Sequence, residues 1–160
     1  MQLFVVRHAV AVAAAPDRDD ATRPLSSAGK RKFHRAVRGM RTLGWRFDRV
    51  LSSPWERAAQ TAKLLGAISI RAPYATELLC IPPRKELLEL ISDSDSQSVA
   101  VVGHEPWLGE LVGWLAFGDA RHGEAVELKK GCVVWLEGTV IPGGMTLRAV
   151  MPPKLLRAVR

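Results

Sequence analysis

Two patterns of apolar and polar residues alternate along the chain, and each predicts a different secondary structure. Short unbroken apolar runs, rich in β-branched residues, are typical of strands buried in a parallel sheet. Such runs occur at residues 3–6 and within residues 98–104, and residues 48–53 (DRVLSS) are interpreted as a further strand. Longer stretches whose apolar residues recur every three or four positions predict helices. These stretches lie at residues 29–41, 54–66, 86–91 and 107–117.

Capping residues mark the ends of the first two predicted helices. Ser26 or Ser27 can cap the helix that contains residues 29–41, which then ends near Gly44. Pro54 suits the first turn of the second helix, and this helix is expected to stop at a glycine, Gly66.

The last third of the chain has a different pattern. Residues 132–138 and 144–151 resemble strands and are separated by Pro142 and two glycines, which predicts an antiparallel pair. Alternating strands and helices followed by such a pair predict an α/β fold. We expect a three-layer α/β/α architecture, in which helices cover both faces of a mainly parallel central sheet with antiparallel C-terminal strands. No repeat or linker divides the chain, so residues 1–160 are expected to form a single domain.

The composition is typical of a globular protein, with 48% apolar and 24% charged residues. No apolar run approaches the roughly 20 residues that cross a bilayer. The N-terminus also lacks a signal-peptide pattern, so we expect a cytoplasmic protein with no membrane partner. Cys80 and Cys132 lie far apart and form no metal-type pair, which predicts reduced, partly buried thiols.

The net charge of +7 predicts attraction to anions, without distinguishing nucleic acid, phosphorylated protein and small phosphates. Much of this charge lies in residues 29–41, where Arg31, Arg35 and Arg38 are on a different helix face from an apolar stripe. The stripe consists of Phe33, Ala36, Val37 and Met40. Two interpretations of the basic face stay open: a solvated helix surface and a docking surface for an acidic partner.

Unusual polar residues follow the predicted strands. Arg7 and His8 end the first strand and His104 ends the third, while Arg57 lies in the first turn of the helix after the second. Ligands of open α/β sheets bind outside the carboxyl ends of the strands, so these side chains are expected to converge there. Guanidinium groups bind phosphate oxygens and an imidazole can attack phosphorus. The set therefore predicts phosphoryl chemistry.

Three segments resemble the histidine phosphatase superfamily, the relatives of the phosphoglycerate mutases. They are RHA at residues 7–9, SSPWERAAQTA at 52–62 and GHEPWL at 103–108. The segment DDATRPLSSAG at 19–29, the short length and the ending MPPKLLRAV resemble more narrowly the SixA-type phosphohistidine phosphatases. The resemblance extends from Leu3 to about Leu156. It implies a phosphoglycerate mutase-like fold and a phosphatase that needs no metal and no cofactor.

The resemblance implies roles for four residues. His8 resembles the nucleophile that becomes phosphorylated, and Arg7 and Arg57 resemble the arginines that clamp the phosphate. His104 resembles the second histidine, which contacts the transferring group. Two nearby guanidinium charges disfavour the imidazolium form and so keep His8 available as a nucleophile. Water would then attack phospho-His8 and complete a two-step hydrolysis.

Other positions allow more than one interpretation. Arg23 matches an arginine at the pocket mouth of SixA-type proteins, but pairing with Asp19 or Asp20 would give it a structural role. Ala9 stands where the wider superfamily often has glycine. Glu77 falls in the region of the general acid of larger members, although its surroundings do not match and an exposed loop glutamate is the alternative. A phosphohistidine substrate needs a strong acid less, because its P–N bond is labile once the imidazole is protonated.

The predicted function is hydrolysis of phosphohistidine on a protein, such as a histidine phosphotransfer domain, by a monomeric enzyme. The short loops include nothing like a lid, so we expect an open, basic cleft. One alternative is a small-molecule phosphomonoesterase of the same superfamily. Another is a non-catalytic phosphate or nucleic-acid binding module, but neither an aromatic stacking surface nor a nucleic-acid motif accompanies the basic helix.

Overall fold

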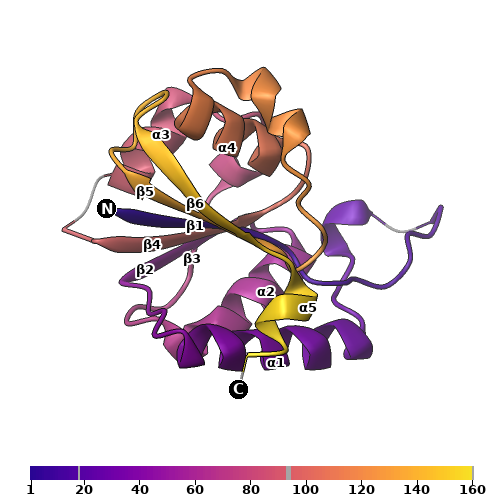
Figure 1. Ribbon diagram of the computed structural model, residues 1–160. Helices are drawn as coiled ribbons and strands as arrows, with labels where there is room; N and C mark the ends of the chain where they lie inside the picture. Colours follow the sequence, from indigo (N-terminus) through magenta and orange to yellow (C-terminus); the bar gives the residue numbers. More distant parts are fainter. Residues whose placement is uncertain (18, 93–94, 160) are drawn as a thin grey trace.

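The computed structural model describes residues 1–17, 19–92 and 95–159, which include a six-stranded sheet with the order β3-β2-β4-β1-β5-β6 (Figure 1). The first four strands run parallel, and β5 pairs antiparallel with both β1 and β6. This sheet confirms the predicted α/β fold. The strands are β1 (Gln2–Arg7), β2 (Arg49–Ser52), β3 (Tyr74–Ala75), β4 (Ser98–Gly103), β5 (Val133–Gly138) and β6 (Met145–Met151).

Helices cover both faces of the sheet and form the expected outer layers (Figure 1). One face carries α1 (Ser27–Thr42), α2 (Glu56–Leu65) and α5 (Pro153–Leu156), and the other carries α3 (Lys85–Ser92) and α4 (Trp107–Phe117). Successive strand residues point to opposite faces. Leu3 and Val5 therefore pack under α3 and α4, whereas Phe4 and Val6 pack under α1 and α2. Burial on both faces explains why the apolar run in β1 is unbroken.

The ends of α1 and α2 agree with the ends predicted from the sequence, except at the start of α2. Ser26 caps α1, and its Oγ accepts a hydrogen bond of 3.0 Å from the Gly29 N–H. Pro54, expected in the first turn of α2, precedes that helix, which begins at Glu56 with Trp55 as its N-cap. The Trp55 N–H donates to Ser53 Oγ at 3.2 Å, so a turn separates β2 from the helix.

Several short elements have no counterpart among the predictions. They are β3, the four-residue helix α5 and four 3₁₀ segments: η1 (Asp20–Thr22), η2 (Gly66–Ile68), η3 (Glu77–Leu79) and η4 (Ala120–Ala125). Segments of two to six residues are too short for a hydrophobic period to be recognised.

The basic helix buries its apolar stripe as predicted, and Arg31, Arg35 and Arg38 are exposed. Cys80 and Cys132 are free thiols. Within the described residues, no helix is both long and apolar enough to cross a bilayer.

Candidate active site

The carboxyl ends of β1 and β4 bring two histidines together. Arg7 pairs with Gly103 in the parallel register, and the next backbone N–H, that of His8, donates to the Gly103 carbonyl at 3.1 Å. His8 and His104 follow their strands directly, so their imidazoles become neighbours, with ring centroids 5.2 Å apart. The pairing that the sequence predicts is therefore present.

Hydrogen bonds fix the tautomer of His8. Its Nδ1 lies 2.7 Å from the Ala9 carbonyl oxygen, which can only accept, so Nδ1 carries the proton. Its Nε2 then has a free lone pair, and Arg57 Nε donates to this nitrogen at 3.2 Å. Nε2 is thus the ring nitrogen that carries the lone pair, and a guanidinium lies directly against it.

Thr61 connects the loop after His8 to the helix that carries Arg57. The Ala9 N–H donates to Thr61 Oγ1 at 3.0 Å, and this hydroxyl donates to the Arg57 carbonyl at 2.7 Å. Thr61 is fully buried. The relative position of the imidazole and the guanidinium therefore depends on one short chain of hydrogen bonds.

A carboxylate occupies the outer side of the Arg57 guanidinium. Arg57 donates from Nη1 to the Asp20 carbonyl at 2.6 Å and from Nη2 to Asp20 Oδ2 at 2.8 Å. The other carboxylate oxygen, Oδ1, accepts from Arg23 Nε at 2.9 Å. Burial would raise the pKa of Asp20, but Arg57 and Arg23 lower it below its ordinary value. Asp20 thus remains a carboxylate and is held between two guanidinium groups. An anionic ligand could be bound by the same two groups.

Arg7 contributes a donor without a partner. Its Nη1 donates to the Leu128 carbonyl at 2.6 Å, whereas its Nε is buried and has no hydrogen-bond partner among the described residues. A buried donor left unpaired costs free energy, and an anion beside His8 would remove that cost.

His104 lies in an aromatic pocket and also has an unpaired nitrogen. Its ring centroid is 4.6 Å from that of Trp55 and 6.3 Å from that of Trp107. Its Nε2 is 2.9 Å from Ser53 Oγ, and its buried Nδ1 has no partner in the described part of the chain. Ser53 Oγ in turn lies 3.0 Å from the thiol sulfur of Cys80.

Burial keeps both imidazoles neutral. It lowers the pKa of His8 to about 4, and the charges of Arg57 and Arg7 act in the same direction. It also lowers the pKa of His104 to about 3, with Arg57 as the next cause. From the sequence, the neutral state of His8 was expected to result from the arginine charges. Removal of the imidazole from water lowers its pKa more than these charges do.

The structure brings together Arg7, His8, Arg57 and His104. Arg23 does not contact these residues directly; it binds Asp20, which in turn binds Arg57. The three central side chains are buried, since His8 and Arg57 are each 4% exposed and His104 is 3% exposed. The segment η1, which carries Asp20, covers Arg57.

Four residues of the site were given no role there by the sequence, although three of them lie in the motif at residues 52–62. They are Ser53, Trp55, Thr61 and Cys80. The pairing of Asp20 with Arg23 was anticipated, but its simultaneous contact with Arg57 was not. Glu77 is exposed in η3 and lies beside Cys80, whose pKa is raised mainly by burial and also by this glutamate. The described residues contain no cluster of three His, Cys, Asp or Glu side chains that could hold a metal ion.

Comparisons with known proteins place the chain among histidine phosphatases. Residues 3–78 match the family model of the histidine phosphatase superfamily (branch 1). An uncharacterized protein of Picosynechococcus is 32% identical over 142 residues, which cover 85% of this chain and 84% of that protein. The phosphohistidine phosphatase SixA of Escherichia coli is 29% identical over 126 residues, covering 74% and 76% of the two chains.

Two solved structures extend the comparison. The protein histidine phosphatase SixA complexed with tungstate superposes with a TM-score of 0.80 at 25% identity, covering 98% of this chain and 99% of that one. The alpha-ribazole phosphatase from Shigella flexneri shares the fold, with a TM-score of 0.74 at 17% identity and coverage of 96% and 97%.

Proposed function

This chain belongs to the histidine phosphatase superfamily and is a phosphatase, and from that premise we propose that it hydrolyses phosphohistidine on a protein through a phospho-His8 intermediate. The observation that carries the proposal is the state of His8. Its Nδ1 proton is held by the Ala9 carbonyl, and its Nε2 lone pair faces the Arg57 guanidinium.

The proposed reaction has two steps. The Nε2 lone pair of His8 attacks phosphorus and the P–N bond of the substrate breaks. The substrate imidazole, already protonated at its other ring nitrogen, takes the bonding electron pair and departs as neutral imidazole. Water then attacks the phosphorus of phospho-His8, which releases inorganic phosphate and restores the neutral imidazole. A low pKa suits both steps, because the nucleophile is unprotonated at neutral pH and the same nitrogen is a good leaving group in the second step.

Three side chains are proposed to hold the phosphoryl oxygens. Arg7 offers its unpaired Nε, Arg57 lies against the attacking nitrogen, and His104 offers Nδ1. The Trp55 N–H donates to Ser53 Oγ, and that hydroxyl can donate to His104 Nε2, which leaves the imidazole proton on Nδ1. Preorganised donors of this kind stabilise the charge that develops on the equatorial oxygens.

Asp20 and Arg23 are proposed to act at the entrance. The Asp20 carboxylate occupies the outer nitrogens of Arg57, so a phosphoryl group that uses them must displace it. Arg23 holds the other oxygen of this carboxylate and would be freed by the same movement.

The site has only a weak candidate for a general acid, Glu77, and a phosphohistidine substrate does not need one. Glu77 is exposed, and its contact in the structure is with Cys80 rather than with His8. A phosphate ester would need a proton donor for its alkoxide, whereas a protonated imidazole leaves without one. The similarity to SixA-type proteins supports the same substrate class.

We also propose that residues 1–160 form one monomeric domain. Support comes from the sheet, in which β1, at the start of the chain, and β6, near its end, both pair with β5.

The test is to trap the intermediate. The protein is mixed with a ³²P-labelled phosphorylated histidine phosphotransfer domain and quenched in alkali, where phosphohistidine survives. Label on His8 in wild type and none in His8→Ala is the expected result. His34→Ala is the matched control, because His34 is an exposed histidine on α1.

The alternatives give different results in the same experiment. Label that appears only with small phosphate esters would favour a small-molecule phosphomonoesterase. Tight phosphate binding with no label from any donor would favour a non-catalytic binding module.

A further inference from the structure

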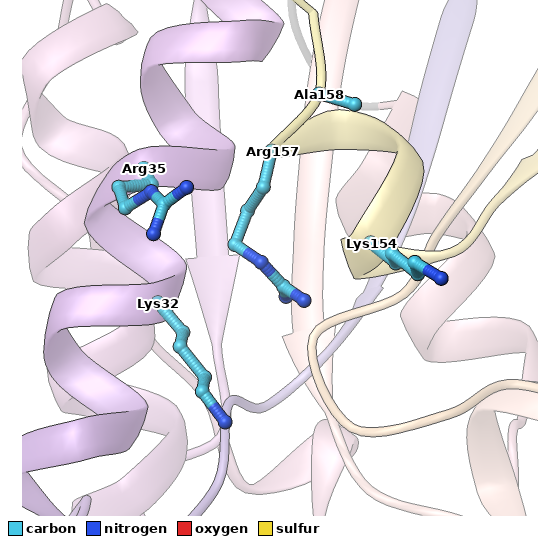
Figure 2. A pocket seen from close by; sticks show the side chains of 5 residues that line it. All are labelled: Lys32, Arg35, Lys154, Arg157 and Ala158. Carbon is cyan, nitrogen blue, oxygen red and sulfur yellow. The ribbon is translucent and has the colours of Figure 1, made fainter.

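A strongly basic groove runs between α1 and the C-terminal helix α5, away from the histidines. Figure 2 shows the Arg157 side chain lying between these helices, with Lys32 and Arg35 extending from α1 on one side and Lys154 on the other. The hollow here has a volume of about 470 Å³, and a second hollow of about 350 Å³ continues it along α1. We call this surface the α1/α5 groove; its cations are Lys32, Arg35, Arg38, Arg41, Lys154 and Arg157.

Among the described residues, the helices that line the α1/α5 groove provide no acidic counterpart for its cations. Residues 27–42 and 152–159 contain no Asp or Glu. None of the six groove cations belongs to an ion pair among the described residues. Six unpaired positive charges repel one another and create a strong local potential, which an anionic partner would neutralise.

A further hollow lies between the groove and the backbone that follows the nucleophile. This hollow shares Lys32 and Arg157 with the groove and is also lined by Ala9 and Lys130. Ala9 adjoins His8, and the charge of Lys130 is close enough to lower the pKa of His8. The Gly131 N–H donates to the His8 carbonyl at 3.0 Å, which places the turn carrying Lys130 against the nucleophile's backbone. Positive charge therefore extends from the groove to the nucleophile.

The size of the groove favours a macromolecule over a small anion. Lys32 and Arg41 are nine residues apart on α1, which corresponds to about 14 Å along the helix. The α1 cations are exposed, and no hydrogen bond from another described residue fixes their side chains, so they suit an extended charged surface better than one small ligand. Phe33, the one aromatic residue that lines these hollows, is 2% exposed and offers no stacking platform for nucleic-acid bases.

We infer that the α1/α5 groove docks an acidic surface of the phosphoprotein substrate while its phosphohistidine reaches His8. This inference rests on the proposed function. Charge complementarity at such a surface raises the association rate and selects the partner, and it leaves the chemistry at His8 unchanged.

The test compares a protein substrate with a small one. In the double variant Arg35→Glu/Arg157→Glu, kcat/KM for a phosphorylated histidine phosphotransfer domain should fall about tenfold or more, and its dependence on salt should weaken. The kcat/KM for p-nitrophenyl phosphate should stay at the wild-type value, because neither arginine contacts the site. Arg35→Gln/Arg157→Gln should give an intermediate loss.

The matched control changes the same charge on the opposite side of the sheet. Arg84→Glu/Lys85→Glu, at the start of α3, should leave both substrates unaffected, because these exposed residues lie far from the groove. Circular dichroism and thermal unfolding check that each variant is folded.

Four results would overturn the inference. Unchanged kcat/KM and salt dependence for the protein substrate would exclude the groove as its docking surface. Equal losses with both substrates would mean that the groove acts on the active site itself. Loss of DNA or RNA binding without loss of protein turnover would identify nucleic acid as the occupant. A wild-type enzyme that hydrolyses p-nitrophenyl phosphate but no phosphoprotein would overturn the proposed function, and this inference with it.

Discussion

Acidification from pH 7 to pH 5 should destabilise this protein through its two buried histidines. The pKa values of His8 and His104 are lowered to about 4 and about 3, against about 6.5 in an unfolded chain. At pH 5 the unfolded state binds a proton at each histidine and the folded state binds almost none. Above pH 6.5 both states leave the imidazole neutral, and proton binding does not lower the free energy of unfolding. As the pH falls from 6.5 towards the folded pKa, protons bind the unfolded state preferentially and this free energy decreases.

The expected loss is large compared with the stability of a small protein. Each histidine should lower the free energy of unfolding by about 2 kcal/mol between pH 7 and pH 5. The two together would account for about 4 kcal/mol, where the total for a domain is roughly 5–15 kcal/mol. Their rings are adjacent, so the two contributions will not add perfectly.

Urea unfolding followed by tryptophan fluorescence at pH 7, 6 and 5 measures this effect. His8→Asn keeps a donor for the Ala9 carbonyl, and His104→Gln keeps a polar group for Ser53. Each variant should lose about 2 kcal/mol less than wild type over this range. His34→Asn, on the exposed face of α1, serves as the control and should behave as wild type. If His8→Asn and wild type show the same pH dependence, His8 is not held neutral by burial.

Three further substitutions test the site and the fold. Arg57→Ala should weaken tungstate binding, measured by calorimetry, by roughly 1.5–3 kcal/mol, the size of a charge-assisted contact; unchanged affinity would place the second clamp elsewhere. Asp20→Asn should tighten tungstate binding, because no carboxylate then competes for Arg57, and weaker binding would mean that Asp20 serves mainly to orient this arginine. Gly39→Ala should destabilise the protein by roughly 1–3 kcal/mol, because an added Cβ would lie 1.8 Å from the Leu156 carbonyl oxygen. Wild-type urea stability in that variant would show that α5 can move away from α1 at little cost.

Much of the fold and the centre of the site could be predicted from local patterns. The unbroken apolar runs of β1 and β4 follow from burial on both faces of a central strand. His8 and His104 directly follow these runs, so parallel pairing was enough to bring them together. The apolar stripe of α1 and its N-cap, Ser26, could also be predicted, because helix periodicity and capping depend on residues three or four positions apart.

The partners of the site residues could not be predicted in this way. Asp20 reaches Arg57 across 37 positions, and Ser53 reaches His104 across 51. Such contacts depend on the path of irregular segments, and η1 is too short to carry a periodic signal. The burial of Arg57 under Asp20 could not be predicted for this reason, because loop length does not reveal that a loop packs on this arginine.

The sequence by itself therefore determined which residues become strands, which helix faces are buried and which chemical groups end the central strands. Each of these depends on the burial of neighbouring residues along the chain. The tertiary structure alone decided that His8 is neutral through burial, that Asp20 covers Arg57 and that Arg157 completes the basic groove beside α1. These properties arise where segments distant in sequence exclude water from one another or bring their charges together, and no local pattern records that.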